Sequence, residues 1–301
     1  MREKEVLKLL GKYIEKPISE RVQEIRMRIG KPVIIFSNGE EYITNISVDK
    51  QEFEKILDYF CKFSLYAFEN EIRQGFITIE GGHRVGISGQ VLVEQGEVKS
   101  FKNISSMNIR ISHEVLNCAD SIIPYITKDK QILNTLIVSP PKCGKTTLLR
   151  DLIRQVSNGN YLMNGCTVGV VDERSELGGS YQGIPQNELG IRTDILDSCP
   201  KSKGMMMLIR SMAPKVIAVD EIGGAEDIHA IRHAMSCGCK ILATVHSGSM
   251  EELRRKPLFE ELIKERYFER YVVLGSKNRI GEIQGIYDSR GSVLFREYQY
   301  A

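Results

Sequence analysis

Hydrophobic positions in the first third of the chain form short runs separated by glycines and polar turns. Runs at helical spacing predict helices, and alternating runs predict strands. Asn38-Gly39 between two β-prone runs is a strong hairpin signal. Glu24, Arg26 and Arg28 alternate with Ile25 and Met27, as on a strand with one buried face. The helices are expected at 6–14, 53–60 and 65–72, and the strands at 33–36, 42–43, 76–79, 84–87 and 90–93.

From about residue 131 the pattern changes to near-continuous apolar strands that alternate with helices. Such strands are covered on both faces, so they predict a parallel α/β sheet. Three further runs at the end of the chain predict an added β-meander. We therefore expect an α+β domain over 1–112, a linker with a bridging helix over 113–130, and an α/β domain over 131–301. The apolar strands of the last domain are 136–138, 168–171, 216–219 and 241–245, and the meander covers 271–274, 282–287 and 292–295.

The segment 139–147 (SPPKCGKTT) directly follows the first apolar strand and opens an amphipathic helix. This is the context of a P-loop, whose backbone N–H groups and helix N-terminus bind phosphates. Lys145 is expected to reach the β- and γ-phosphates of ATP, and Thr146 to bind Mg²⁺. Ser139 replaces the first glycine of G-x-x-x-x-G-K-[ST]. The loop residues expected to bind nucleotide are Ser139, Pro140, Pro141, Lys142, Cys143, Gly144, Lys145, Thr146 and Thr147.

Carboxylates follow the strand at 216–219, in the manner of a Walker B element. We expect Asp220 to hold the metal and Glu221 to orient or deprotonate the attacking water. Glu173, after the second strand, is the alternative for that role. His246 ends the fourth strand, where it can contact nucleotide. The carboxyl ends of parallel strands share one edge of a sheet, so these groups are expected to converge.

Three arginines, Arg174, Arg192 and Arg210, lie in or near polar segments of the same domain. An arginine supplied across a subunit boundary would neutralise charge in the transition state, and Arg192 and Arg210 are candidates for it. The sequence does not single out one of them.

The charge balance is nearly even, with Lys+Arg 41 against Asp+Glu 39 and a net charge of +2. Nonspecific binding to nucleic acid or to an anionic membrane therefore has no support from charge. The charged beginning of the chain and the lack of long apolar runs predict a cytoplasmic protein. The 7 cysteines lack the paired spacing of a zinc site.

The acidic pair Asp172-Glu173, the Asp220-Glu221 pair and Ala243-Thr244-Val245-His246 resemble the Asp box, Walker B and His box of ring-forming type II/type IV secretion ATPases. Longer strings resemble the stage III sporulation protein AA family of endospore-forming bacteria. Those strings are EIRMR at 24–28, GFITIEGGHRVGISGQ at 75–90, SPPKCGKTTLLR at 139–150, VDERSE at 171–176 and KSKGMMMLIRSMAPKVIAVDEIG at 201–223.

This resemblance implies a RecA-like or AAA+ core and a cytosolic, hexameric ATPase that uses ATP and Mg²⁺. It implies docking, through a membrane-anchored partner, at the mother-cell face of the channel that joins mother cell and forespore. No direct contact with nucleic acid or membrane is expected. Asp172-Glu173 reverses the Glu-Asp order found in many secretion ATPases.

Three alternatives remain beside a mechanochemical ATPase. A nucleotide-gated ring scaffold would bind ATP but scarcely hydrolyse it. A small-molecule kinase is disfavoured, because Asp220-Glu221 suits attack by water. A nucleic-acid motor is disfavoured by the even charge.

Overall fold

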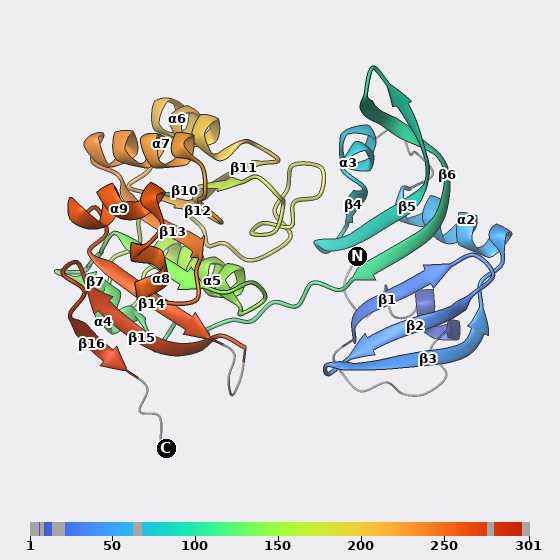
Figure 1. Cartoon of the computed structure of the whole chain (residues 1–301), viewed down its shortest axis with the longest axis horizontal. Coiled ribbons are helices and arrows are strands. Elements are labelled where there is room, and N and C mark those ends of the chain that lie inside the picture. Colours follow the sequence, from blue (N-terminus) through green and yellow to red (C-terminus); the bar gives the residue numbers. More distant parts are fainter. Residues whose placement is uncertain (1–5, 7–8, 14–21, 63–67, 276–279, 297–301) are drawn as a thin grey trace. The chain divides into compact units, whose positions relative to one another are not determined.

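The computed structural model describes residues 6, 9–13, 22–62, 68–275 and 280–296 (Figure 1). The chain divides into two compact units. Unit 1 comprises Met1–His113 and Gly179–Gln186, and unit 2 comprises Glu114–Gly178 and Asn187–Ala301. A short segment from the middle of the sequence therefore belongs with the N-terminal part. Among the described residues, no helix has the length and apolar character needed to cross a membrane.

Unit 1 is built on a six-stranded antiparallel sheet with strand order β3-β2-β1-β6-β5-β4. Asn38 and Gly39 have φ of 52° and 83°, so they form the hairpin turn that the sequence predicts between β2 and β3. Asp49 accepts a hydrogen bond from Glu52 N and caps the first long helix. The elements are η1 (Gly11–Tyr13), β1 (Val22–Arg28), β2 (Pro32–Ser37), β3 (Glu40–Ser47), α2 (Lys50–Phe60), α3 (Glu69–Arg73), β4 (Phe76–Ile79), β5 (His83–Glu94) and β6 (Glu97–Arg110).

One prediction for unit 1 needs correction, and two predicted helices lie partly outside the described residues. The runs at 84–87 and 90–93 belong to one strand, β5, which stays paired with β6 through several irregularities of register. The helix expected over 65–72 begins at Glu69 within the described residues, and 65–67 lie outside them. Residues 7–8 and 14 of the first predicted helix also lie outside the described residues.

The segment Gly179–Gln186 forms a tight turn whose tyrosine packs in the core of unit 1. Tyr181 and Ile184 exchange backbone hydrogen bonds of 2.9 and 3.0 Å around Gln182 and Gly183, which both have positive φ. The Tyr181 ring stacks on Phe68, with 6.4 Å between centroids, and only 7% of the residue is exposed. This segment is therefore an integral part of the hydrophobic core of unit 1.

Unit 2 contains an eight-stranded sheet with order β11-β10-β12-β13-β9-β14-β15-β16. Strands β11 to β14 of this order run parallel, and β15 and β16 continue the sheet antiparallel as the predicted meander. The elements are α4 (Ile123–Ile126), β7 (Thr127–Lys128), β8 (Gln131–Ile132), β9 (Thr135–Ser139), α5 (Lys145–Asn158), β10 (Val168–Asp172), β11 (Thr193–Asp197), α6 (Lys201–Ser211), β12 (Val216–Val219), α7 (Ala225–Ser236), β13 (Lys240–His246), α8 (Met250–Arg254), α9 (Pro257–Lys264), β14 (Arg270–Gly275), β15 (Glu282–Asp288) and β16 (Val293–Arg296).

Alternate residues of the parallel strands point to two hydrophobic clusters, one on each face of the sheet. On β12, Ile217 and Val219 pack with residues of α6, α7, α8 and α9. Val216 and Ala218 of the same strand pack with residues of α4 and α5. Coverage of both faces explains the continuous apolar runs, and it confirms the predicted α/β class with a mostly parallel sheet.

Candidate active site

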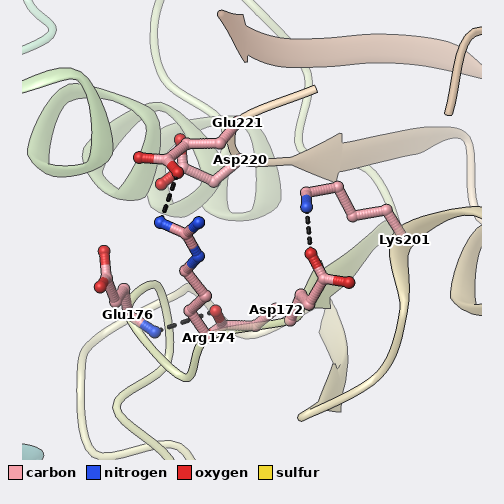
Figure 2. A pocket seen from close by; sticks show the side chains of 7 residues that line it. Asp172, Arg174, Glu176, Lys201, Asp220 and Glu221 are labelled. Carbon is pink, nitrogen blue, oxygen red and sulfur yellow. Dashed lines mark hydrogen bonds and ion pairs between the residues drawn. The ribbon is translucent and has the colours of Figure 1, made fainter. Parts of the chain in front are cut away.

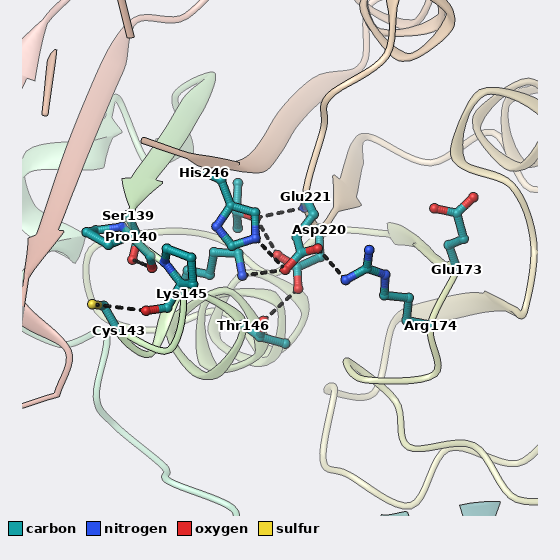
Figure 3. Close-up of polar contacts among 12 residues, drawn as sticks. Ser139, Pro140, Cys143, Lys145, Thr146, Glu173, Arg174, Asp220, Glu221 and His246 are labelled. Carbon is teal, nitrogen blue, oxygen red and sulfur yellow. Dashed lines mark hydrogen bonds and ion pairs between the residues drawn. The ribbon is translucent and has the colours of Figure 1, made fainter. Parts of the chain in front are cut away.

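The carboxyl ends of β9, β10, β12 and β13 bring the predicted polar groups to one edge of the sheet (Figure 3). Ser139 and His246 are direct partners in the register of β9 and β13. Val171 of β10 pairs with Val219 of β12, so Asp172 and Asp220 leave neighbouring strands together. The parallel order of the strands therefore gathers side chains that are far apart in the sequence.

The P-loop ends at Gly144, which has φ of 84° and is the N-cap of α5. A Cβ at this position would lie 3.3 Å from Gly281 Cα, so both conformation and space favour glycine. Ser139, at the other end of the loop, is fully buried and donates a 2.9 Å hydrogen bond to Pro140 O. Its φ is not positive, so the serine does not need the backbone freedom of the glycine it replaces.

Two polar pairs join the P-loop to the residues after β12. Lys145 Nζ lies 2.5 Å from Glu221 Oε1, and the two side chains are 7% and 15% exposed. Thr146 Oγ1 donates to Asp220 Oδ2 at 2.6 Å. The structure thus brings together the predicted phosphate-binding, metal-binding and catalytic side chains.

Glu221 accepts two further contacts from the neighbouring strands. Arg174 Nη1 donates to its Oε2 at 2.6 Å, and His246 Nε2 lies 3.0 Å from its Oε1. Burial acts to raise the pKa of the Glu221 carboxyl, but the hydrogen bond and charge of Lys145, with Arg174 and His246, outweigh burial and lower it. The φ of Glu221 is 56°, a left-handed conformation that costs a non-glycine residue about 1–3 kcal/mol.

Glu173, the alternative for positioning water, pairs with Lys201 at the start of α6. Within the described residues Glu173 forms no hydrogen bond or ion pair with Lys145 or Thr146, whereas the two carboxylates after β12 do. A cavity of about 10 Å³ lies between these groups, large enough for about one water-sized sphere (Figure 2). It is lined by Asp172, Glu173, Arg174, Glu176, Lys201, Asp220 and Glu221.

Asp172 shapes the loop that carries Arg174. Its carboxylate accepts backbone N–H groups of Glu176, Leu177 and Gly178 at 2.8–2.9 Å. Burial is the main influence on this group and raises its pKa to about 6, against the opposing effect of these hydrogen bonds. Asp172 therefore holds this loop in its conformation. From the sequence alone, it was recognisable only as one of two adjacent acidic residues.

The three arginines lie in different surroundings. Arg174 contacts Glu221 directly. Arg192 Nη1 donates to Ser157 O at 2.8 Å, at the far end of α5, which is about 20 Å from its N-terminus. Arg210 is exposed on α6 and has no hydrogen bond or ion pair within the described part of the chain. Both arginines of the predicted pair are exposed, and they differ in that the Arg192 guanidinium is held by backbone carbonyls whereas that of Arg210 is not, within the described residues.

The remaining P-loop residues differ in their surroundings. Cys143 is buried and its thiol lies 3.5 Å from Pro141 O, while Lys142 is exposed with φ of 62°. The backbone oxygen of Thr147 faces the Cys118 thiol. Sequence reasoning gave no role to Thr244, whose hydroxyl bonds Asp220, or to Lys201. A single hydroxyl within the apolar run of β13 was the available signal for Thr244.

The arrangement suits binding of a nucleoside triphosphate with a hard divalent cation. A lysine at a helix N-terminus attracts phosphate, and hydroxyl and carboxylate oxygens are ligands that Mg²⁺ prefers. No cluster of three or more His, Cys, Asp or Glu residues forms a metal site in the described ranges. A cation at Thr146 and Asp220 would therefore need phosphate oxygens and water to complete its coordination.

Comparison with solved structures agrees with this fold. The solved structure of the ATPase DotB from Legionella pneumophila is similar, with a TM-score of 0.58 and 16% identity, over 91% of this chain and 76% of that one. The pilus retraction motor PilT, solved with bound ADP, also gives a TM-score of 0.58, at 12% identity over 91% of this chain and 78% of that one. The chain therefore shares the fold of DotB and PilT.

Sequence relatives identify the family. Stage III sporulation protein AA of Bacillus subtilis (strain 168) is 40% identical over 299 residues, which cover 97% of both proteins. The protein ycf45 of Porphyra purpurea is 23% identical over 97% of this chain and 48% of its own length. The family profile described as "Sporulation stage III, protein AA" matches residues 2–294. The chain belongs to the sporulation stage III protein AA family.

Proposed function

We propose that this protein is an ATPase that hydrolyses ATP to ADP and phosphate at the edge of the unit 2 sheet. The observation that carries the proposal is the double pairing of Lys145 with Glu221 and of Thr146 with Asp220. This pairing joins a phosphate-binding lysine and a metal-binding hydroxyl to two carboxylates within one polar cluster.

Each residue has a distinct part in the proposed reaction. Lys145 would bind the β- and γ-phosphates, and Thr146 with Asp220 would hold Mg²⁺, which neutralises phosphate charge when bound. Glu221 would accept a proton from the attacking water. Lys145 and Arg174 outweigh burial and lower the pKa of its carboxyl, so the carboxylate is a weak base while these ion pairs persist. A shift of Lys145 from Glu221 to a phosphate would raise that pKa and make the carboxylate a stronger base.

The family and the fold support a cellular setting for this activity. We propose that the protein forms a ring, with a hexamer as our expectation, in which an arginine of one subunit completes the site of the next. Membership of a sporulation family supports action on the channel between mother cell and forespore. Docking would occur at the mother-cell face through a membrane-anchored partner, with the protein itself in the cytoplasm. Neither direct nucleic-acid binding nor membrane insertion is part of the proposal.

The experiment compares the wild-type protein with Lys145→Ala and Glu221→Gln. Nucleotide affinity is measured with a fluorescent ATP analogue, turnover by phosphate release, and oligomer mass with and without a nonhydrolysable ATP analogue. The proposed ATPase binds and hydrolyses ATP as an oligomer, and Lys145→Ala loses affinity. A protein that assembles with ATP but does not hydrolyse it would be a nucleotide-gated scaffold. No ATP binding by the wild type would refute both functions.

A further inference from the structure

Thr244 is a buried hydroxyl residue in the middle of the sheet of unit 2. The residue is 0% exposed and lies on β13 within the otherwise apolar run 241–245. Its side chain accepts a hydrogen bond from Glu221 N at 2.8 Å and donates one to Asp220 Oδ1. Its carbonyl accepts from Ile222 N at 2.9 Å. One residue of β13 therefore contacts all three positions that follow β12.

The two oxygens of Asp220 have different partners. Thr244 donates to Oδ1, and Thr146 of the P-loop helix donates to Oδ2. Because a carboxylate is planar, holding one oxygen restricts the direction of the other. The hydroxyl from β13 thus aims Oδ2 at the side where the P-loop hydroxyl lies.

The Glu221 backbone depends on the same hydroxyl. Its φ of 56° lies in the left-handed region, which is unfavourable for glutamate. The hydrogen bond from Glu221 N to Thr244 Oγ1 satisfies the N–H that this turn leaves without a ladder partner. The backbone conformation of a residue determines the direction in which its side chain leaves the main chain. The Thr244 hydroxyl therefore also helps to orient the Glu221 side chain.

We propose that Thr244 is a positioning residue for ATP hydrolysis, which orients Asp220 toward the metal and Glu221 toward the water; this inference rests on the proposed function. Groups that hold a metal ligand from behind typically contribute 10- to 100-fold to metal affinity or activity. Within the described residues the Thr244 side chain bonds Asp220 and Glu221 and forms no hydrogen bond with Lys145, so we expect nucleotide affinity without metal not to depend on it.

A matched control lies on the neighbouring strand. Thr135 of β9 is also 0% exposed, and its hydroxyl donates to Leu133 O at 2.8 Å. It pairs with Leu242, at the opposite end of β9 from the P-loop. Thr135→Val therefore removes a buried hydroxyl from the same sheet without touching the carboxylates.

The experiment uses the full chain with Thr244→Val, Thr244→Ser and Thr135→Val. Turnover and KM are measured by phosphate release, Mn²⁺ affinity of the protein–ADP complex by electron paramagnetic resonance, and ADP affinity in EDTA by fluorescence. We expect Thr244→Val to lower kcat and Mn²⁺ affinity by roughly 10- to 100-fold, with ADP affinity in EDTA unchanged. Thr244→Ser should restore both to within about threefold, and Thr135→Val should lower only the melting temperature.

Normal kcat and Mn²⁺ affinity in Thr244→Val would overturn the inference, as would equal losses in Thr135→Val. If the valine variant does not fold, Thr244→Cys, whose thiol is a weak donor, takes its place, and wild-type behaviour of that variant is the contrary result. Absence of turnover in the wild type would reject the proposed function alone, because the Mn²⁺ arm still tests Thr244.

Discussion

Lys145 and Glu221 form an ion pair of 2.5 Å, although one opens the helix after β9 and the other follows β12. The group expected to bind phosphate is therefore paired with the group expected to activate water, and this pairing lowers the pKa of the Glu221 carboxyl. A phosphate that bound Lys145 would compete with Glu221 for the same ammonium group. Weakening of the ion pair would raise the basicity of the carboxylate.

Replacing Glu221 by Gln tests this relationship. The amide is nearly isosteric but cannot accept a proton, so turnover should fall by roughly 100-fold or more. ATP affinity should stay equal or increase, because Lys145 no longer has to leave an ionised partner. Fluorescent ATP titration and phosphate release measure the two effects. Normal turnover in Glu221→Gln would show that the base is another group, with Glu173 as the first alternative.

Arg174 should influence the pH dependence of the reaction. It stabilises the ionised Glu221 carboxylate and thereby contributes to its lowered pKa. Activity that needs this carboxylate is lost as the pH falls through that pKa. Arg174→Gln should raise the pKa and move the acidic limb of the kcat/KM profile to higher pH, while Arg174→Lys should move it less. Superimposable acidic limbs for all three proteins would contradict the assignment.

Subunit mixing should separate the roles of Arg210 and Arg192. If exposed Arg210 acts in a neighbouring site, Arg210→Ala should lose activity and regain some when excess Lys145→Ala chains supply their intact arginine. Arg192→Ala should instead destabilise the fold by about 1 kcal/mol, because it leaves carbonyls at the end of α5 without their cation. Phosphate release and melting temperature are measured for each mixture. No recovery with Arg210→Ala would count against its role between subunits.

Asp172 should make stability depend on pH between about 4 and 6. Its folded-state pKa of about 6 exceeds the ordinary value of 3.8, so in this range the folded protein binds more protons than the unfolded chain. The contribution of Asp172 to the free energy of unfolding should therefore decrease by up to about 3 kcal/mol as the pH rises through this range. The Asp172→Asn variant should lack this pH-dependent contribution. Urea unfolding at pH 4.5 and at pH 7 measures the free energy of unfolding of both proteins. An equal change between the two pH values in wild type and variant would contradict the prediction.

The strength of local signals explains which parts of the fold the sequence predicted. Asn38-Gly39 determines its turn by itself, and apolar strands such as 216–219 need little context. β11 escaped prediction because Thr193–Asp197 is short, half-buried and polar at both ends, as an edge strand can be. β5 was divided at its glycines, yet the ladder with β6 continues past Gly89. There, close approach of Asn103 O leaves no room for a Cβ.

The candidate site, like the fold, was predictable only where local sequence signals are strong. Lys145, Thr146, Asp220 and Glu221 are recognisable because each stands next to a strand or helix signal. Pairings such as Glu173 with Lys201, or the three N–H groups that Asp172 accepts, arise from loop conformation. Loop conformation depends on tertiary packing, which no local pattern records.

The division of the chain into units has a consequence for proteolysis. The backbone passes between the units after residues 113, 178 and 186, because Gly179–Gln186 belongs to unit 1. After a single cut following residue 113, Tyr181 would belong to the C-terminal fragment but would stay packed in the hydrophobic core of unit 1. The two fragments should therefore elute together in gel filtration and separate only in denaturant. Expression of residues 114–301 alone would expose that tyrosine to solvent. The N-terminal fragment and the turn around Tyr181 should thus behave as two halves of a complementation pair.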